Sequence, residues 1–232
     1  LAHQVSVARQ SEQLRTTLID AMAHEFKTPL TAIKAATSML LANPHQPQES
    51  YREMLKIADE EAEHLRKLID NTIEMARLDT ARIEIKPEFA DLEAIVREIA
   101  EEMAPPASGR QLKVEIVGQI SPIAIDCRLI RLALKQLLDN ALKYSPDEIP
   151  VGIRVYQTVD LVAVGITDQG AGIPLREQAR IFDRFFRSPS VQQQVPGSGL
   201  GLTIARSIVR AHHGDITVDS RPGETTFHLT LP

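Results

Sequence analysis

The feature that most constrains this chain is a pair of amphipathic helical patterns separated by two prolines near its start. Apolar side chains recur three or four positions apart from Leu14 to Leu40 and again from Tyr51 to Ala76. Such spacing places them on one face of a helix. The stretch Asn43–Pro47 ends the first pattern, because proline lacks the N–H that a helix interior needs. The short connection therefore predicts an antiparallel helical hairpin.

A hairpin with one apolar stripe on each helix leaves much of both stripes exposed unless something covers them. Pairing with a second copy buries them in a dimeric four-helix bundle. Packing of the stripes onto the rest of the chain is the alternative. We expect the homodimer.

The composition excludes several classes of protein. The chain has 232 residues, with 26 Lys and Arg against 31 Asp and Glu, and its net charge of −5 does not suit a nucleic-acid-binding polycation. A single cysteine, Cys127, excludes an internal disulfide framework and a cysteine-based zinc site. No apolar run reaches the roughly 18 residues that a membrane span needs. The sequence begins at Leu1 without a signal-like segment, so we expect that an upstream part is missing.

The pattern changes near Asp79, after which strands occur mostly as neighbouring pairs with helices between the groups. The predicted helices are Leu92–Met103, Leu129–Tyr144 and Leu200–Ala211, and the predicted strands are Arg82–Lys86, Leu112–Val117, Ile123–Ile125, Val151–Val159, Leu161–Thr167, Asp215–Ser220 and Thr225–Leu231. We therefore predict two domains, residues 1–80 and 81–232. The second is expected to be an α+β sandwich with one mixed or antiparallel sheet and helices on one face.

The string His24–Leu30 on the first predicted helix is the first candidate for chemistry. Thr28 lies one turn after His24 on the same face, where a zinc-protease motif would need a second histidine. The carboxylate of Glu25 can hold one imidazole nitrogen and leave the other as a nucleophile. Pro29 removes the helical partner of the Glu25 carbonyl, so a bend or loosened turn is expected there. The alternative is a solvated surface histidine.

A second candidate is the segment Gln136–Pro146, in which Gln136, Asn140 and Lys143 share one stripe of a helix. Amide oxygens together with phosphate oxygens and waters suit Mg²⁺, and a lysine one turn further on can meet phosphate charge. A polar face turned to water is the alternative for this helix taken alone.

Two glycine-rich segments complete the set. Asp168–Pro174 directly follows a predicted strand, and its glycines let a ligand approach the backbone while Asp168 can accept a hydrogen bond from an amino group such as that of adenine. Gly197–Leu202 opens a helix and can present N–H groups to phosphate. Neither matches the dinucleotide fingerprint or the P-loop. Between them, the aromatics of Ile181–Arg187 are expected to anchor one end of a lid that contains Ser188–Pro196.

Taken together, these motifs resemble those of the sensor histidine kinases of two-component systems, in the family's order and across almost the whole chain. The matching segments are His24–Leu30 (H box), Gln136–Pro146 (N box), Asp168–Ile173 (G1 box), Phe182–Phe186 (F box) and Gly197–Leu202 (G2 box). The resemblance implies the cytoplasmic core of such a kinase. A dimerisation and histidine-phosphotransfer hairpin is then followed by an α/β sandwich ATP-binding domain of the Bergerat (GHKL) type, shared with gyrase and mismatch-repair ATPases.

The resemblance also implies roles for single residues. His24 is the implied phosphoacceptor, Glu25 its orienting base, and Thr28 the residue that positions water for dephosphorylating the regulator. Asn140 is the implied Mg²⁺ ligand, together with Gln136, where the family usually has Asn. The residues implied in ATP binding are Asn140, Lys143, Tyr144, Asp168, Gly170, Gly172, Gly197, Gly199 and Gly201.

The function implied is ATP-dependent autophosphorylation on histidine, followed by phosphoryl transfer to an aspartate of a separate response regulator. ATP and Mg²⁺ are the expected cofactors, and no nucleic-acid partner is expected. A degenerate kinase that only binds nucleotide or regulator, supported by Gln136, is one alternative, and a net regulator phosphatase is another. The six other histidines, among them His212, match no family motif and are interpreted as structural or surface residues.

Overall fold

The computed structural model describes residues 22–23, 25–43, 47–80, 84–104, 111–189, 195 and 197–232. Two compact units make up the chain, Leu1–Ile73 and Glu74–Pro232. The predicted domain boundary after residue 80 stays a prediction.

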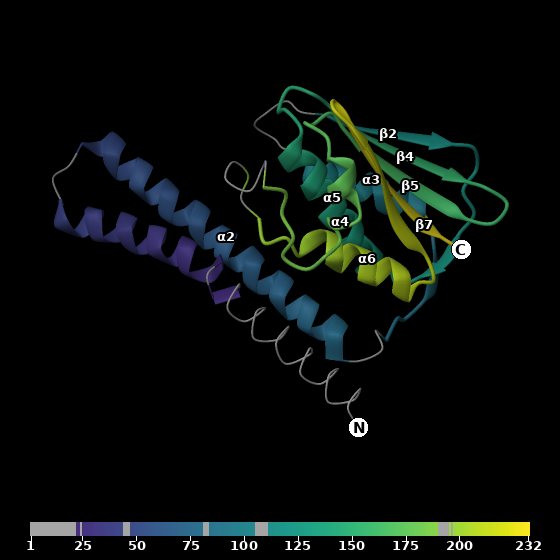
Figure 1. Ribbon diagram of the computed structural model, residues 1–232, viewed down its shortest axis with the longest axis horizontal. Coiled ribbons are helices and arrows are strands. Elements are labelled where there is room, and N and C mark those ends of the chain that lie inside the picture. Colours follow the sequence, from purple (N-terminus) through teal and green to yellow (C-terminus); the bar gives the residue numbers. More distant parts are fainter. Residues whose placement is uncertain are drawn as a thin grey trace. The chain divides into compact units, whose positions relative to one another are not determined.

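The first unit is built on a helical hairpin. A helix over residues 25–42 and helix α2, Gln48–Thr80, run antiparallel and side by side (Figure 1). Of the predicted break, Asn43 and Pro47 are not helical, and residues 44–46 lie outside the described part. Pro47 stands just before α2, where a missing N–H costs nothing, and its carbonyl accepts the Tyr51 N–H at 3.0 Å. The antiparallel hairpin predicted from the sequence is confirmed.

The second unit contains a five-stranded mixed sheet in the order β2-β4-β5-β7-β6. Its strands are β2 Leu112–Val117, β4 Val151–Gln157, β5 Val162–Asp168, β6 Asp215–Arg221 and β7 Glu224–Leu231. Strand β2 pairs with β4 in parallel, and all other neighbours pair antiparallel. The C-terminal strand β7 thus lies between β5 and β6, so the last part of the chain completes the interior of the sheet.

Three helices cover one face of this sheet: α3 Leu92–Met103, α4 Cys127–Tyr144 and α6 Gly201–Ala211 (Figure 1). Along β7 the buried side chains alternate with half-buried ones such as Thr226 and His228. The buried set packs with the apolar stripes of the helices into one core. The two-layer α+β sandwich expected from the sequence is confirmed.

Helices α4 and α6 are joined by a buried link that the sequence did not reveal. Asp126 caps α4, and its two carboxylate oxygens accept the N–H groups of Leu129 at 3.1 Å and Lys86 at 3.0 Å. The Asp126 N–H donates to Nε2 of His212 at 3.0 Å, so Nδ1 carries the proton and faces the Ile208 carbonyl oxygen at 2.8 Å. The start of α4 is thereby fixed to the end of α6.

A small antiparallel pair, β1 Glu88–Ala90 with β3 Ile123–Ile125, precedes α4. The strand expected across Arg82–Lys86 is wrong for its described part, because residues 84–87 adopt no strand geometry. Helix α5, Leu175–Gln178, is a single turn after β5. Within the described parts of the chain, no helix is at once long and apolar enough to cross a membrane.

Candidate functional site

The phosphotransfer residues expected on the first helix are described only in part. His24 lies outside the described residues, Glu25 is half-buried and Thr28 is exposed. The helix over residues 25–42 runs through Pro29 without a break. The bend or loosened turn expected at Pro29 stays a prediction.

The polar stripe of α4 lies against the start of α6. Gln136 and Asn140 are half-buried, and an ideal Cβ built on Gly201 would lie only 2.5 Å from Gln136 Oε1. Lys143, one turn after Asn140, is exposed, and its Nζ lies 2.6 Å from Asp139 Oδ2. The absence of a side chain at Gly201 therefore lets the second glycine-rich segment approach the α4 stripe.

The first glycine-rich segment closes on the other end of α4. Asp168, the last residue of β5, is only 2 % exposed, and its Oδ1 accepts the Gly170 N–H at 2.9 Å. A Cβ on Gly170 would stand 2.4 Å from the carbonyl oxygen of Tyr144. This close approach of two backbones requires glycine and brings Asp168 beside the end of the N-box helix.

The turn between β6 and β7 supports the same segment. Gly172 has a φ of +81°, and a Cβ there would meet the Arg221 carbonyl oxygen at 2.6 Å. The Gly223 N–H donates to the Gly170 carbonyl oxygen at 3.0 Å. The loop after β5 is therefore held in place by the sheet's last hairpin.

The segment after α5 meets the start of α6 at a defined contact. The Phe185 N–H donates to the Gly199 carbonyl oxygen at 3.0 Å, and both residues have left-handed φ values, 59° and 66°. Phe182, Phe185 and Phe186 are partly buried against the core. The lid that these aromatics are expected to anchor stays a prediction, because most of it, residues 190–194 and 196, lies outside the described residues. None of the described residues has an atom within 4 Å of an ideal Cβ on Gly197.

These contacts bring three of the predicted nucleotide elements together around α4. The buried Asp168 carboxylate, the close-packed glycine backbone and the half-buried amides of Gln136 and Asn140 fit a nucleotide with a divalent cation, because such a cation takes oxygen ligands and shares them with phosphate. Asn140, Gln136 and Lys143 are the residues that could face the phosphate end.

Sequence reasoning missed the charged residues that brace this arrangement. Burial alone would raise the pKa of Asp126, but the N–H groups of Lys86 and Leu129 hold it below its ordinary value. Arg206 Nε and Nη2 donate to the two oxygens of Asp215 at 2.8 and 3.0 Å. Buried His212 agrees with its interpretation as a structural residue. In the sequence, the position of Asp126 just before a predicted helix indicates a helix cap. No comparable pattern indicates the Arg206–Asp215 pair.

Family models match both parts of the chain. Residues 14–81 match the His Kinase A (phospho-acceptor) domain, and residues 125–232 match the histidine kinase-, DNA gyrase B-, and HSP90-like ATPase. The chain is 33 % identical to the sensor protein KdpD of Clostridium acetobutylicum over 226 residues, which cover 96 % of this chain and 25 % of that protein. It spans between 25 % and 60 % of the length of curated relatives such as this one and the kinase SasA of Synechocystis.

Solved structures of histidine kinases are also similar to this chain. A mycobacterial sensor histidine kinase, MprB, is 34 % identical with a TM-score of 0.55, and the match covers 63 % of this chain and 97 % of that one. Histidine kinase ThkA, solved in complex with response regulator protein TrrA, shares the fold with a TM-score of 0.77 at 20 % identity, over 97 % of this chain and 63 % of that one.

Proposed function

Because this chain belongs to the sensor histidine kinases of two-component systems, we propose that it transfers the γ-phosphoryl group of ATP to His24 and then to an aspartate of a separate response regulator. The observation that carries the proposal is the convergence at α4: Gly201 packs against Gln136, and Gly170 packs against the Tyr144 carbonyl. The family membership supports a division of labour in which residues 1–80 dimerise and carry the phosphoacceptor, and residues 81–232 bind ATP.

On the phosphotransfer helix, one ring nitrogen of His24 attacks the γ-phosphorus while the bond to the β–γ bridging oxygen breaks and ADP leaves. Glu25 accepts a hydrogen bond from the N–H of the other ring nitrogen and so leaves the attacking nitrogen unprotonated. Once the new N–P bond has formed, the proton of that N–H can pass to Glu25. The demand on the protein is positioning and charge neutralisation, since a largely dissociative transfer needs little covalent help.

In the ATP-binding part, Asp168 accepts a hydrogen bond from the adenine amino group. Gly170 and Gly172 shape that pocket through their close approach to the backbones of Tyr144 and Arg221. Lys143 and Tyr144 line the nucleotide pocket. Gly197, Gly199 and Gly201 support the phosphate side. When bound, Mg²⁺ would neutralise charge on the phosphate oxygens; Asn140 would hold it, and Gln136 would support it less directly.

The test of this proposal is a phosphorylation assay with γ-labelled ATP on the wild-type chain and on His24→Gln. The wild type should take up label that is acid-labile and base-stable, whereas His24→Gln should bind ATP and take up none. Because the two sites lie in different parts of the chain, ATP binding by the variant is the internal control. Acid-labile label on His24→Gln would contradict the assignment of His24.

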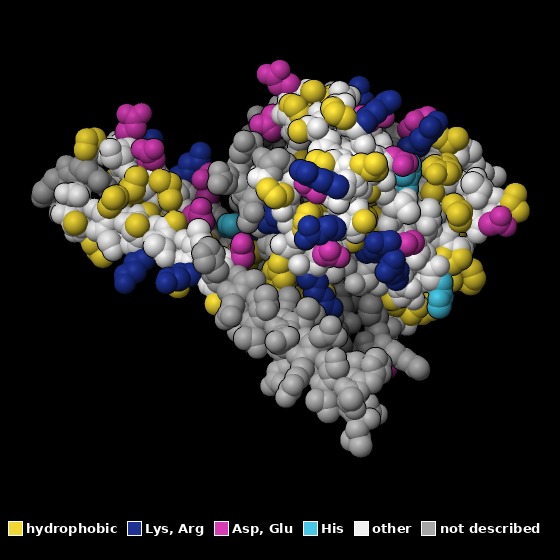
Figure 2. All heavy atoms as spheres, in the orientation of Figure 1, with side chains coloured by type: hydrophobic (Ala, Val, Ile, Leu, Met, Phe, Trp, Pro, Cys, Tyr) yellow, Lys and Arg dark blue, Asp and Glu magenta, His cyan; other side chains and the backbone are white. Residues whose placement is uncertain are grey.

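We propose that the hairpin pairs with a second copy to form the four-helix bundle. Its described residues include large apolar side chains between 43 and 56 % exposed: Leu30, Met39, Tyr51, Leu55, Ile69 and Ile73. Apolar side chains also gather on the hairpin face seen in Figure 2. Charge at Ile69 should dissociate the dimer, because an unpaired buried charge costs several kcal/mol. Monomeric wild-type chain at tens of micromolar by light scattering would refute the bundle.

One contact favours the degenerate kinase as a second candidate. The side-chain amide of Gln136 packs against the backbone at Gly201. This contact is compatible with a role of Gln136 in packing as well as with a role in metal binding. In that case the wild type would bind ATP and regulator without acquiring label. A net phosphatase is distinguished from a kinase by incubating the chain with phosphorylated regulator. A net phosphatase would remove the phosphate from the regulator, and this activity would depend on Thr28.

A further inference from the structure

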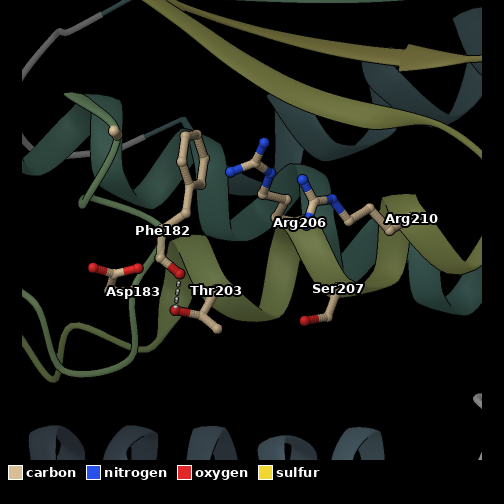
Figure 3. A pocket seen from close by; sticks show the side chains of 7 residues that line it. Phe182, Asp183, Thr203, Arg206, Ser207 and Arg210 are labelled. Carbon is tan, nitrogen blue, oxygen red and sulfur yellow. Dashed lines mark hydrogen bonds between the residues drawn. The ribbon is translucent and has the colours of Figure 1, made fainter.

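A pocket of about 200 Å³ lies between α6 and the segment that follows α5. Figure 3 shows Thr203, Arg206 and Arg210 along one side of α6, with Phe182 and Asp183 facing them. None of these side chains belongs to the proposed catalytic or ATP-binding set. Their contacts therefore need an explanation of their own.

Two side chains of α6 contact Phe182, one at its backbone carbonyl and the other at its ring. Thr203 Oγ1 donates to the Phe182 carbonyl oxygen at 2.9 Å, and the guanidinium carbon of Arg206 lies 4.4 Å from the centre of the Phe182 ring. A guanidinium at that distance over an aromatic face is attracted by the ring's negative face. Backbone and ring of Phe182 are thus both fixed to the same helix.

Arg206 is itself held in one orientation by Asp215, the first residue of β6. Both oxygens of Asp215 accept from Arg206, a paired geometry that only the planar guanidinium provides. Arg210 donates to the same carboxylate at 3.0 and 3.4 Å. In Figure 3 the Arg206 guanidinium lies between the Phe182 ring and Arg210. Of the two arginines, Arg206 is therefore the one that contacts both the Asp215 carboxylate and the ring.

The residue so fixed stands at the base of the connection between α5 and α6. Three residues after Phe182, the Phe185 N–H meets the Gly199 carbonyl oxygen, and a Cβ on Gly199 would lie 2.7 Å from Phe185. Two residues after Gly199, Gly201 packs against Gln136. Movement of Phe182 away from α6 would therefore loosen the Phe185–Gly199 contact next to the α4 stripe.

We propose that Arg206 is a positioning residue: by joining Asp215 to the Phe182 ring it fixes the Phe185–Gly199 contact and so sets the affinity of the neighbouring site for MgATP. The second half of this statement rests on the proposed ATP-binding function. The first half concerns only contacts within the chain.

A double-mutant cycle on the full chain tests the proposal. Arg206→Lys keeps the charge but loses the planar fork, and Phe182→Leu keeps an apolar side chain but loses the ring. Each is expected to raise the dissociation constant for MgATP, measured by calorimetry, about five-fold. Both substitutions remove the same contact, that of Arg206 with the Phe182 ring. The double variant should therefore bind MgATP as well as either single variant does. Arg210→Lys is the matched control, since Arg210 shares Asp215 without touching the ring, and it should bind MgATP as the wild type does.

Effects that multiply in the double variant, to about 25-fold, would overturn the proposal. So would an Arg210→Lys variant weakened as much as Arg206→Lys, because the ion pair rather than the ring contact would then matter.

Hydrogen exchange of the Phe185 amide tests the first half without nucleotide. Its protection should fall about ten-fold in Arg206→Lys and in Phe182→Leu, and stay unchanged in Arg210→Lys. Unchanged protection in Arg206→Lys would overturn the proposal. If the wild type bound no MgATP while this exchange pattern held, the ATP-binding function would fail and the positioning role of Arg206 on the backbone would stand.

Discussion

Replacing Gly170 with alanine tests whether the close approach of the loop after β5 to the end of α4 builds the nucleotide pocket. The added Cβ would lie 2.4 Å from the Tyr144 carbonyl oxygen and 2.9 Å from Asp168 Oδ1, whereas ordinary contacts begin at 3.4 Å. The first neighbour is backbone. The second is the buried carboxylate that accepts the Gly170 N–H. Neither can move aside without shifting the pocket.

An overlap of this kind in a packed interior costs about 1–3 kcal/mol. For a chain of this size, each kcal/mol lowers Tm by about 2–4 °C, so Gly170→Ala should melt about 2–12 °C below the wild type. Displacement of Asp168 should also weaken MgATP binding at least about ten-fold, equivalent to about 1.4 kcal/mol. Thermal unfolding without nucleotide and calorimetric titration measure the two effects separately.

Gly152→Ala in β4 is the matched control. A Cβ there would lie 3.8 Å from the Thr167 Cβ, an ordinary contact, so Tm and MgATP affinity should stay near those of the wild type. If Gly170→Ala behaved like Gly152→Ala in both measurements, the packing of Gly170 on Tyr144 would not shape the pocket, and the reasoning would be refuted.

Three further predictions concern other parts of the chain. Thr28→Ala should autophosphorylate like the wild type but dephosphorylate the regulator more slowly, because Thr28 is exposed and lies four positions after His24 in sequence; equal loss of both activities in the two assays would argue against a separate role. Asn140→Ala should abolish Mg²⁺-dependent autophosphorylation, whereas Gln136→Asn should preserve or improve it, as measured by rate against Mg²⁺ concentration; an inactive Gln136→Asn that still binds ATP would show that the longer side chain is needed. Hydrogen bonds from Arg206 hold the pKa of Asp215 well below its ordinary value, although burial acts in the opposite direction. The Asp215 carboxylate therefore stabilises the fold above about pH 4, and this contribution is lost as the pH falls further. The difference in unfolding free energy between wild type and Asp215→Asn in urea should accordingly be large at pH 7 and shrink below pH 4; a difference that grew on acidification would contradict this.

Local features of the fold were predictable because short stretches encode them. Asp91, directly before α3, accepts the Ala94 N–H at 3.2 Å and caps the helix. The turn at Val159–Asp160 is closed by the Thr158 N–H on the Leu161 carbonyl oxygen at 2.8 Å. Each of these contacts joins residues close in sequence, so composition and spacing are enough.

What could not be predicted depends on residues far apart in the chain. Helical periodicity of α6 places Arg206 on a polar face, but not beside Phe182, because the path of the intervening segment is set by packing. The link from Asp126 to His212 spans 86 positions and has no local pattern. In the candidate site, the residue types followed from the motifs, whereas the contacts of Gly201 with Gln136 and of Gly170 with Tyr144 needed the tertiary structure.

The place of β7 between β5 and β6 has a consequence for how the protein is made. On the ribosome, β5 emerges well before residues 224–231, so one of its edges waits unpaired until those residues have been synthesised. Unpaired edges invite association with other chains, which favours rapid completion of the sheet once those residues appear. The helical hairpin precedes all of these strands in the chain and so emerges before them. On the proposed function, the segment that carries His24 therefore emerges before the sheet of the ATP-binding part is complete.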